Sequence, residues 1–583
     1  MVSPTPRLGA LAFILAALTL LGVLATLPPT GFFSADSGPK YWQCLAFAEG
    51  EGRPRGFDYP ARDLDPGRRY VPPFTAPVGD RLASIYPVLF PLLAAIPELA
   101  AGDRALRLLP WLAALAAAWA TGRLASALRG ESVTWPGAAM ALAATPLAFY
   151  ALAFWEHSLA SAMVVGGLLL VIADERGGSR IGWRWWTLGL LVGLGTWART
   201  EVAFLIPVLL LGASLPLARH AWRTALSLAT GCAAGLTAGA ALQAAALGNW
   251  LPLHVTYHAA SSLRAHAFLT SRLASLELFV SPHWSCGLAA ALWLAAIATV
   301  VSRVGSRSRT GQVLGLAAVA ASVAAATVVP AVRWLAGARP TEAFPVWAPA
   351  TTWLALSALP ILLWGQPRDL VRDRRRLLLA AVAVWSIAAV IAARAIHAFE
   401  WGGRFFLPSV LVLLAIMASL RVVDGPGLRL RRAAVAAAIA TAVAVQALGL
   451  VLLHHGATTH HRITVELLAF SEPDEPIVTE SYMLPLLSGR GWWQRRFLYA
   501  TGRPGVERLA ASFTQHGVAR WTYATLERTP AGVLGDDREL VGSDGCRWTS
   551  SLALERDIGS ERLRLVRFER RRPTRSTAET EVP

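Results

Sequence analysis

The chain has 583 residues, of which 55% are hydrophobic and 16% charged, with a mean hydropathy of +0.46. Soluble domains carry about a quarter charged residues, so this composition excludes an ordinary soluble protein, and recurring apolar runs of about 20 residues predict a polytopic α-helical membrane protein rather than a β-barrel. The net charge of +17 comes from arginine-rich loops between apolar runs, the positive-inside pattern, and we expect no nucleic-acid partner.

The N-terminal part of the chain predicts one span followed by a long outer loop. Residues 8–27 are apolar without a convincing cleavage site, which predicts an uncleaved span whose N-terminus lies in the cytoplasm. Residues 28–104 then form the first extracytoplasmic loop. Its last part, 84–104, is apolar but interrupted by prolines, and we interpret it as interfacial or re-entrant because a span there would invert every later arginine-rich loop.

Downstream hydrophobic runs bring the expected number of spans to about thirteen, which places the C-terminus outside. They are predicted at 105–122, 137–154, 158–173, 185–199, 202–217, 224–247, 285–301, 313–333, 346–364, 377–396, 405–420 and 433–453. Trp155 is among the tryptophans near predicted span ends, where an interfacial aromatic belt is typical.

The composition changes after residue 454. Short strands are predicted at 475–481, 495–500, 519–526 and 562–571, with a helix at 502–517. The expected organisation is therefore a transmembrane domain over 1–454, a small soluble extracytoplasmic α/β domain over 455–570, and a disordered tail over 571–583.

Ionisable residues on the predicted outer side are the candidate functional residues, because charges held at membrane depth are functional by default. They are Asp36, Lys40 (the only lysine of the chain), Glu156, His157, Arg199, Glu201 and Arg404. A site at the outer membrane edge suits a lipid-linked sugar donor. Transfer of the sugar needs a base that takes the proton of the acceptor, and Asp36 can fill this role. It also needs fixed cations near the departing phosphate, a role for Arg404, Arg199 or Lys40.

Four stretches resemble the GT-C-fold membrane glycosyltransferases, in particular the ArnT, protein O-mannosyltransferase and RgtA/B/C/D-like families. They are "SADSGPKYWQ" after the first span, "IYPVLFPLLAAIPELAAGDRALRLLP", "GLGTWARTE" and "WGGRFFLPSV". The sequence departs from the families at Tyr86-Pro87, where no second proline follows, and at Glu156-His157, where many members carry a second outer aspartate.

The resemblance implies a hexosyl or pentosyl transferase in the cell membrane. Such an enzyme moves a sugar, with inversion, from a polyprenyl-phosphate donor to an envelope glycan, lipid or protein on the outer face. The resemblance implies a catalytic base at Asp36 and a phosphate contact at Arg404. Surrounding membrane lipids are the other expected partners. We assign no metal ligands and leave a divalent cation open as a cofactor.

Each residue of the first loop also has a structural interpretation. Asp36 precedes an expected helix and fits an N-cap position, a role that can coexist with that of a base. Lys40 lies four residues further on, where an i,i+4 ion pair with Asp36 is an alternative to a phosphate contact.

The later candidates carry similar alternatives. The Glu156-His157 pair can simply begin a helix, since an acid is favourable there. Arg199 and Glu201 can form a structural pair inside the bundle instead of binding substrate. Arg404 can place its charge at the interface instead of on a phosphate.

Other functions remain open from the sequence. A transporter or lipid flippase predicts inverted repeats and acids in mid-span, and neither is evident. A non-catalytic scaffold for the C-terminal domain would tolerate loss of Asp36. An O-antigen ligase or polymerase would carry its large loop late in the chain, whereas the longest polar loop here follows the first span.

Overall fold

The fold is described from a computed structural model. It describes residues 6–50, 56–173, 181–214, 221–255, 354–363, 373–393, 404–421, 428–526, 539–559 and 561–571, and the single residues 292, 317, 320 and 321.

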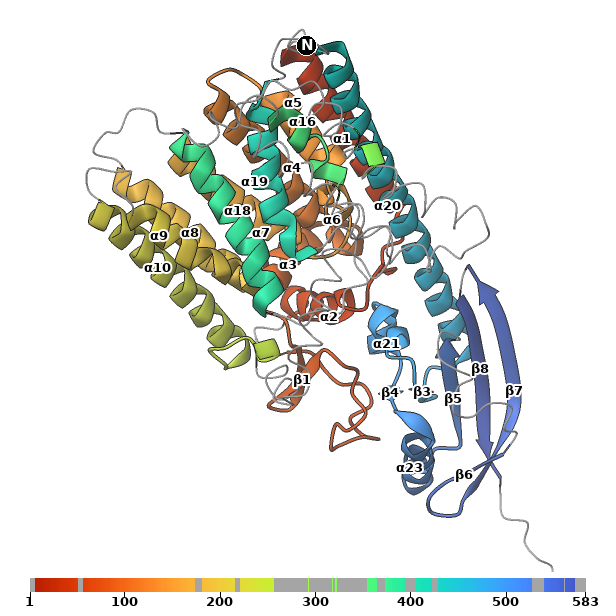
Figure 1. Ribbon diagram of the computed structural model, residues 1–583. Coiled ribbons are helices and arrows are strands. Elements are labelled where there is room, and N and C mark those ends of the chain that lie inside the picture. The colour runs from red at the N-terminus through yellow and green to blue at the C-terminus, as the bar shows by residue number, and fades with distance from the viewer. Residues whose placement is uncertain are drawn as a thin grey trace, which may run out of the picture. The chain divides into compact units, whose positions relative to one another are not determined.

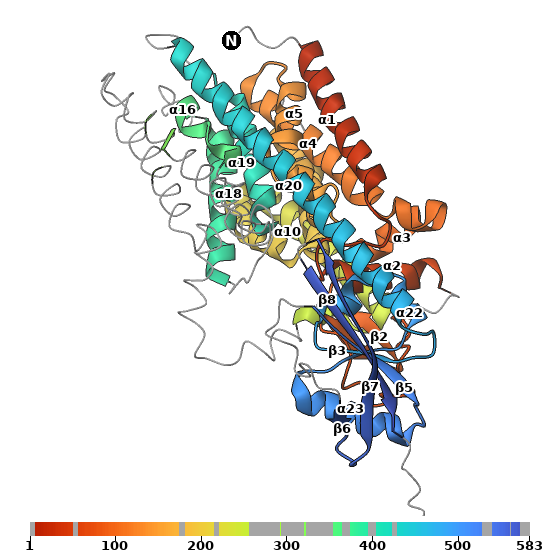
Figure 2. The ribbon, with the colours of Figure 1, turned by 90° about the vertical axis from the view of Figure 1, so that its right-hand side faces the viewer.

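Two compact units make up the chain. The first comprises Met1–Leu27, Gln43–Pro54 and Ile85–His454, and the second comprises Pro28–Trp42, Arg55–Ser84 and His455–Pro583. Two helices contribute residues to both units, α2 (Ser37–Ala48) and α20 (Leu428–Phe470). Figure 2 shows α20 as one continuous helix, so the change in composition after residue 454 falls inside a helix.

The first unit is helical (Figure 1). Its described elements, besides the parts of α2 and α20, are α1 (Pro6–Thr26), α3 (Leu89–Ala101), η1 (Gly102–Ala105), α4 (Leu108–Arg129), α5 (Thr134–Ala144), α6 (Leu147–Tyr150), α7 (His157–Ile172), α8 (Ile181–Ala198), η2 (Thr200–Phe204), α9 (Leu205–Ser214), α10 (Ala221–Leu247), α16 (Leu359–Leu363), α18 (Arg374–Ala393), η4 (Arg404–Phe406) and α19 (Leu407–Ser419).

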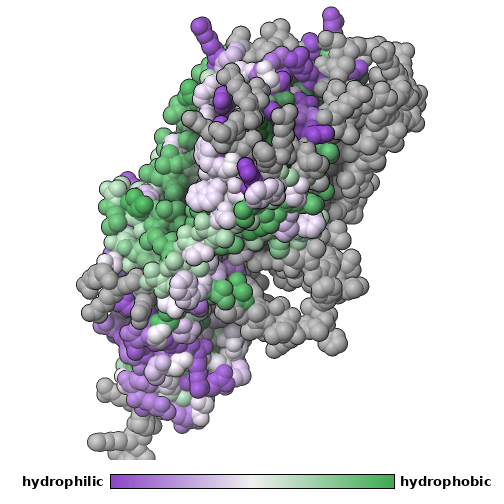
Figure 3. Space-filling model, turned by 90° about the vertical axis from the view of Figure 1, so that its left-hand side faces the viewer, coloured by the Kyte–Doolittle hydropathy of each residue, from purple (hydrophilic) through white to green (hydrophobic). Residues whose placement is uncertain are grey.

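Among the described helices, α1, α4, α10 and α20 are long and apolar enough to cross a membrane. Large apolar side chains such as Leu11, Leu211 and Trp222 are exposed, and Figure 3 shows hydrophobic surface over much of the helical region facing the viewer. Such surface is typical of contact with lipid. The chain therefore has the predicted combination of apolar helices of membrane length and a C-terminal sheet domain. The number of about thirteen spans stays a prediction, because nearly all of 285–301 and 313–333, and residues 346–353 of the span 346–364, lie outside the described residues.

One predicted span differs in detail from the structure, and the segment predicted to be interfacial or re-entrant contains a short helix. The segment 137–154 is not one helix, because α5 ends at Ala144 and α6 begins after Pro146, whose ring lacks the N–H that a continuous helix needs. The segment 84–104 holds α3, whose 13 residues extend about 20 Å, short of a hydrocarbon core of about 30 Å. Its interfacial placement stays a prediction.

Glycines let α8 and α10 approach closely. Methyl groups built on Gly189 and Gly193 of α8 would overlap backbone of α10, and those built on Gly231 and Gly235 of α10 would overlap backbone of α8. Small residues four apart on facing helices are a common basis of packing in membranes, where apolar side chains gain little by leaving lipid.

The second unit contains a six-stranded mixed sheet in the order β4-β3-β5-β8-β7-β6. Its elements are β1 (Thr75–Val78), β2 (Arg81–Ser84), β3 (Ile477–Thr479), α21 (Met483–Leu487), α22 (Gly491–Gln494), β4 (Phe497–Tyr499), α23 (Gly502–Gln515), β5 (Arg520–Leu526), β6 (Glu539–Val541), β7 (Arg547–Ile558) and β8 (Glu561–Arg570).

The strand β3, which lies between β4 and β5, is parallel to both, and the remaining pairs are antiparallel. The amphipathic helix α23 packs against the sheet, where its Phe513 contacts Trp521 of β5. The four predicted strands and the helix at 502–517 are confirmed, whereas β6 and β7 were not predicted.

Part of the first loop belongs to this second unit. The hairpin β1-β2 turns at Gly79, whose φ of 60° suits glycine. The backbone N–H of Tyr499 donates to the carbonyl of Tyr70 at 2.7 Å, and Arg496 pairs with Asp63 at 2.9 Å. Segments more than 400 residues apart in sequence thus form one body.

Candidate active site

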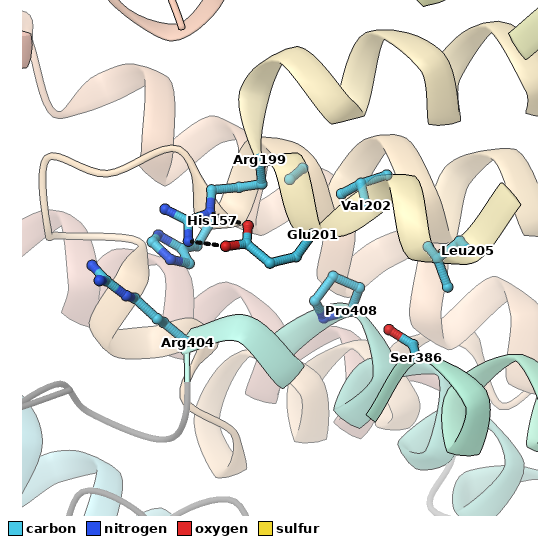
Figure 4. Close-up of a pocket in the computed structure, with 9 residues that line it drawn as sticks. His157, Arg199, Glu201, Val202, Leu205, Ser386, Arg404 and Pro408 are labelled. Carbon is cyan, nitrogen blue, oxygen red and sulfur yellow. Dashed lines mark hydrogen bonds and ion pairs between the residues drawn. The ribbon is translucent and has the colours of Figure 1, made fainter. Parts of the chain in front are cut away.

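Four of the seven candidate residues line a pocket in the first unit, and a fifth, Glu156, lies beside it. The pocket encloses about 340 Å³, part of it open to solvent, and is lined by His157, Ala160, Arg199, Glu201, Val202, Leu205, Ser386, Arg404 and Pro408 (Figure 4). Glu156 lies next to the pocket through its contact with Arg199. The pocket residues come from α7, the α8–η2 junction, α9, α18, η4 and α19.

Arg199 is held by two buried carboxylates. Its Nη1 donates to Glu156 Oε1 at 2.7 Å, and its Nε and Nη2 donate to the two oxygens of Glu201, each at 3.1 Å. Glu156 and Glu201 are 3% and 6% exposed. A buried charge needs such compensation, and a guanidinium fits a carboxylate in this two-bonded form.

Helix ends bring the side chains of Glu156, Arg199 and Glu201 together. Glu156 directly precedes α7, and its carbonyl accepts the N–H of Ala160. Arg199 is extended, with φ −142° and ψ 116°, and so ends α8 before η2 begins at Thr200. This break allows Arg199 and Glu201, two residues apart, to contact one another, which they could not do within one helix.

Aromatic rings surround His157. Its ring stacks on Tyr150 with centroids 4.8 Å apart and lies 5.4 Å from Trp155, and all three side chains are buried. The guanidinium carbon of Arg404 lies 5.4 Å from the centre of the Trp155 ring, within the range of a cation–π contact. Arg404 begins η4, which leads into α19, where Pro408 stands in the first turn.

The charges of this cluster differ in their surroundings. Arg199 is balanced by Glu156 and Glu201, whereas Arg404 lines the pocket from the opposite wall in Figure 4, against an aromatic face. The arrangement can hold an anionic group near Arg404. The bonds of Arg199 to Glu156 and Glu201 keep the facing wall of the pocket rigid. His157 offers ring nitrogens at the same pocket.

Asp36 and Lys40 belong to the second unit. Asp36 directly precedes α2, so it occupies the N-cap position, and its backbone N–H donates to Ser34 Oγ at 3.4 Å. Lys40 lies in the first turns of α2 and is 1% exposed. Lysine is almost never so buried without compensation. The structure thus places two of the candidates in one unit and the other five in the other unit.

Among the residues that the structure describes, no group of three or more His, Cys, Asp or Glu side chains is arranged to hold a metal ion. Glu201 in the pocket wall and Glu156 beside the pocket both pair with Arg199. A divalent cation stays a prediction.

Sequence reasoning missed the aromatic wall of the pocket. Tyr150 was not singled out, and the interpretation of Trp155 as an interfacial belt residue is wrong, because Trp155 is 1% exposed. The aromatic density of "FYALAFWEH" directly before Glu156-His157 was the signal available. Ser386 and Pro408 carry no comparable signal.

Neither a protein-family model nor a curated protein matches the chain. Among solved structures, the chain is similar to ArnT from Cupriavidus metallidurans bound to undecaprenyl phosphate, with 13% identity, a TM-score of 0.48, and coverage of 95% of this chain and 97% of that one. It is also similar to the Archaeoglobus fulgidus oligosaccharyltransferase in complex with Zn and sulfate, with 14% identity, a TM-score of 0.46, and coverage of 88% and 67%.

A further similar structure is AglB from Archaeoglobus fulgidus with an inhibitory peptide and a dolichol-phosphate, with 12% identity, a TM-score of 0.45, and coverage of 89% and 70%. ArnT is one of the families that the sequence motifs resemble. Because the TM-scores lie below 0.5 and the identities are low, we carry no residue role and no activity from these structures to this chain.

Proposed function

We propose that this protein is a GT-C-type membrane glycosyltransferase that uses a polyprenyl-phosphate sugar. The observation that carries the proposal is the pocket in the first unit, where Glu156, Arg199 and Arg404 all stand at helix ends inside an apolar helical bundle. Charges are costly in such a bundle and mark function. Their position at helix ends favours a site for a headgroup over a pathway through mid-helix.

In the proposed reaction, Asp36 accepts the proton of an acceptor hydroxyl as its oxygen attacks the anomeric carbon. The bond from that carbon to the phosphate oxygen breaks with its electron pair, and polyprenyl phosphate leaves. A fixed cation near the departing phosphate lowers the barrier because negative charge accumulates there. The acceptor is an envelope glycan, lipid or protein on the outer face.

Arg404 is the cation we propose for the phosphate, because its guanidinium lines the pocket and lies over the Trp155 ring, while Arg199 bonds to Glu156 and Glu201. Lys40 is a second candidate, since its ammonium would act as a point charge. The assignments to Asp36 and to Arg404 are made separately, each within its own unit.

The proposal is tested with the purified full-length protein in detergent, a panel of labelled polyprenyl-phosphate sugars, and total membrane lipid as acceptor. We expect release of polyprenyl phosphate together with a labelled product. If the donors stay intact and the reconstituted protein instead moves them across liposome membranes, the protein is a transporter and the proposal is wrong.

A further inference from the structure

The segment that carries Asp36 and Lys40, residues 28–42, belongs to the same compact unit as the C-terminal domain, residues 455–571. Although this segment directly follows α1 in sequence, three of its hydrogen bonds within the unit are with residues more than 400 positions later. This raises the question of what the C-terminal domain does for Asp36.

The start of the segment is held by α20. His460 Nδ1 lies 2.7 Å from the carbonyl oxygen of Phe32, and His461 Nδ1 lies 3.0 Å from Thr30 Oγ1. Between them, a methyl group built on Gly31 would overlap the carbonyl of Ala457. The backbone entering the Asp36 turn therefore lies directly against this helix.

The end of the segment is held by a tryptophan stack. Trp42 donates its indole N–H to the carbonyl of Gly489 at 3.1 Å, and its ring stacks on Trp492 with centroids 4.3 Å apart. Trp492 is fully buried and also faces Tyr59 and Phe497, each at 6.1 Å. Stacked aromatic pairs add to the stabilisation that comes from burial.

The middle of the segment makes a backbone contact as well. Gly38, two residues after Asp36, lies so close to α21 that a methyl group there would overlap the carbonyl of Leu486. Asp36 and Lys40 thus stand between two fixed ends, with a third contact in the first turn of α2.

We propose that the C-terminal domain positions Asp36 and Lys40 for the reaction, with Gly38, Trp42 and Trp492 as positioning residues. This rests on the proposed function, in which Asp36 is the base. The domain is then part of the catalytic machinery rather than only an appended module. A misplacement of about 1 Å can cost about 100-fold in rate, so loss of the stack changes the chemical step more than donor binding.

The test compares Trp492→Leu with Trp521→Leu in the full-length protein. Both tryptophans are fully buried in the same unit, but Trp521 packs on Phe513, Trp548 and Phe568. We expect Trp492→Leu to lower kcat by about 10- to 100-fold and to leave KM for the donor within about twofold of the wild-type value. We also expect this variant to show faster amide hydrogen exchange in residues 28–42. Trp492→Phe, which keeps a stacking ring, restores most of kcat. Trp521→Leu lowers the melting temperature similarly but leaves kcat and exchange in 28–42 near wild type.

If Trp492→Leu does not fold, Gly38→Ala replaces it, with Gly505→Ala as control because a methyl group there meets only the Ala500 side chain at 3.4 Å and its backbone at 3.8 Å. The proposal is overturned if the Trp492 and Trp521 variants lose kcat equally, or if exchange in 28–42 does not respond to Trp492. A wild-type protein that transfers no sugar overturns the proposed function instead, and the exchange measurement still decides whether the domain anchors the segment.

Discussion

At the scale of single residues, Arg199 and Arg404 line one pocket with different roles. Arg199 bonds to Glu156 and Glu201, all three largely withdrawn from solvent. Arg404 faces the Trp155 ring. Arg199 therefore stabilises the fold, and Arg404 is the residue that we propose for binding the phosphate of the donor.

Replacing each arginine by alanine separates these roles. Arg199→Ala leaves two buried carboxylates without their cation, and we expect it to destabilise the protein by about 3–5 kcal/mol, the range measured for broken buried pairs. Arg404→Ala should raise KM for the donor by about 10-fold or more, as loss of a charged contact implies, with a smaller change in stability. Thermal unfolding in detergent and steady-state kinetics give both readouts. Equal melting temperatures for Arg199→Ala and wild type would contradict the assignment.

At the scale of elements, the contact between α8 and α10 depends on the absence of side chains. Gly189 and Gly193 on one helix meet Gly231 and Gly235 on the other, so the two backbones touch. Since α8 ends at the residue before Arg199, this contact helps fix the pocket wall.

We expect Gly235→Ala to destabilise the protein by about 1–3 kcal/mol, because its methyl group overlaps the carbonyl of Leu190 and the helices must separate. Gly166→Ala in α7 is the matched control, since a methyl group there meets nothing within 4 Å. It should be neutral or stabilising by about 0.5–1 kcal/mol through helix propensity. Melting temperatures of the two variants test this, and a Gly235→Ala protein as stable as Gly166→Ala would refute the close-contact argument.

At the scale of the whole molecule, hydrophobic runs predicted the described helices of the first unit well, because a membrane-length apolar run has few alternatives. The strand β7 was missed because most of its residues are exposed and little alternation marks it.

The Arg199–Glu201 pair was predicted from two residues close in sequence, but Glu156, 43 residues away, was not expected to join them. The union of residues 28–42 with the C-terminal domain could not be predicted either, since contacts across more than 400 residues leave no local pattern.

The predicted position of the C-terminal domain outside the membrane can be tested with a native cysteine of the chain. Cys546 is partly exposed, whereas Cys44 and Cys232 are buried. A membrane-impermeant maleimide should label Cys546 in right-side-out vesicles but not in sealed inverted ones, if the C-terminal domain lies outside. A Cys286→Ser background removes the fourth cysteine, and Cys546→Ser should abolish labelling. Labelling in inverted vesicles alone would place the domain in the cytoplasm.

The central claim is that Asp36 is the base of a glycosyl transfer, and its most direct test is the transfer rate of Asp36→Asn. Sugar transfer from a labelled polyprenyl-phosphate donor is measured for this variant and for wild type, with melting temperatures to establish folding. We predict a fall of about 10²- to 10⁴-fold, as expected for loss of a general base, at an unchanged melting temperature. A folded Asp36→Asn protein that transfers sugar at the wild-type rate would contradict the account and leave Asp36 with the N-cap role alone.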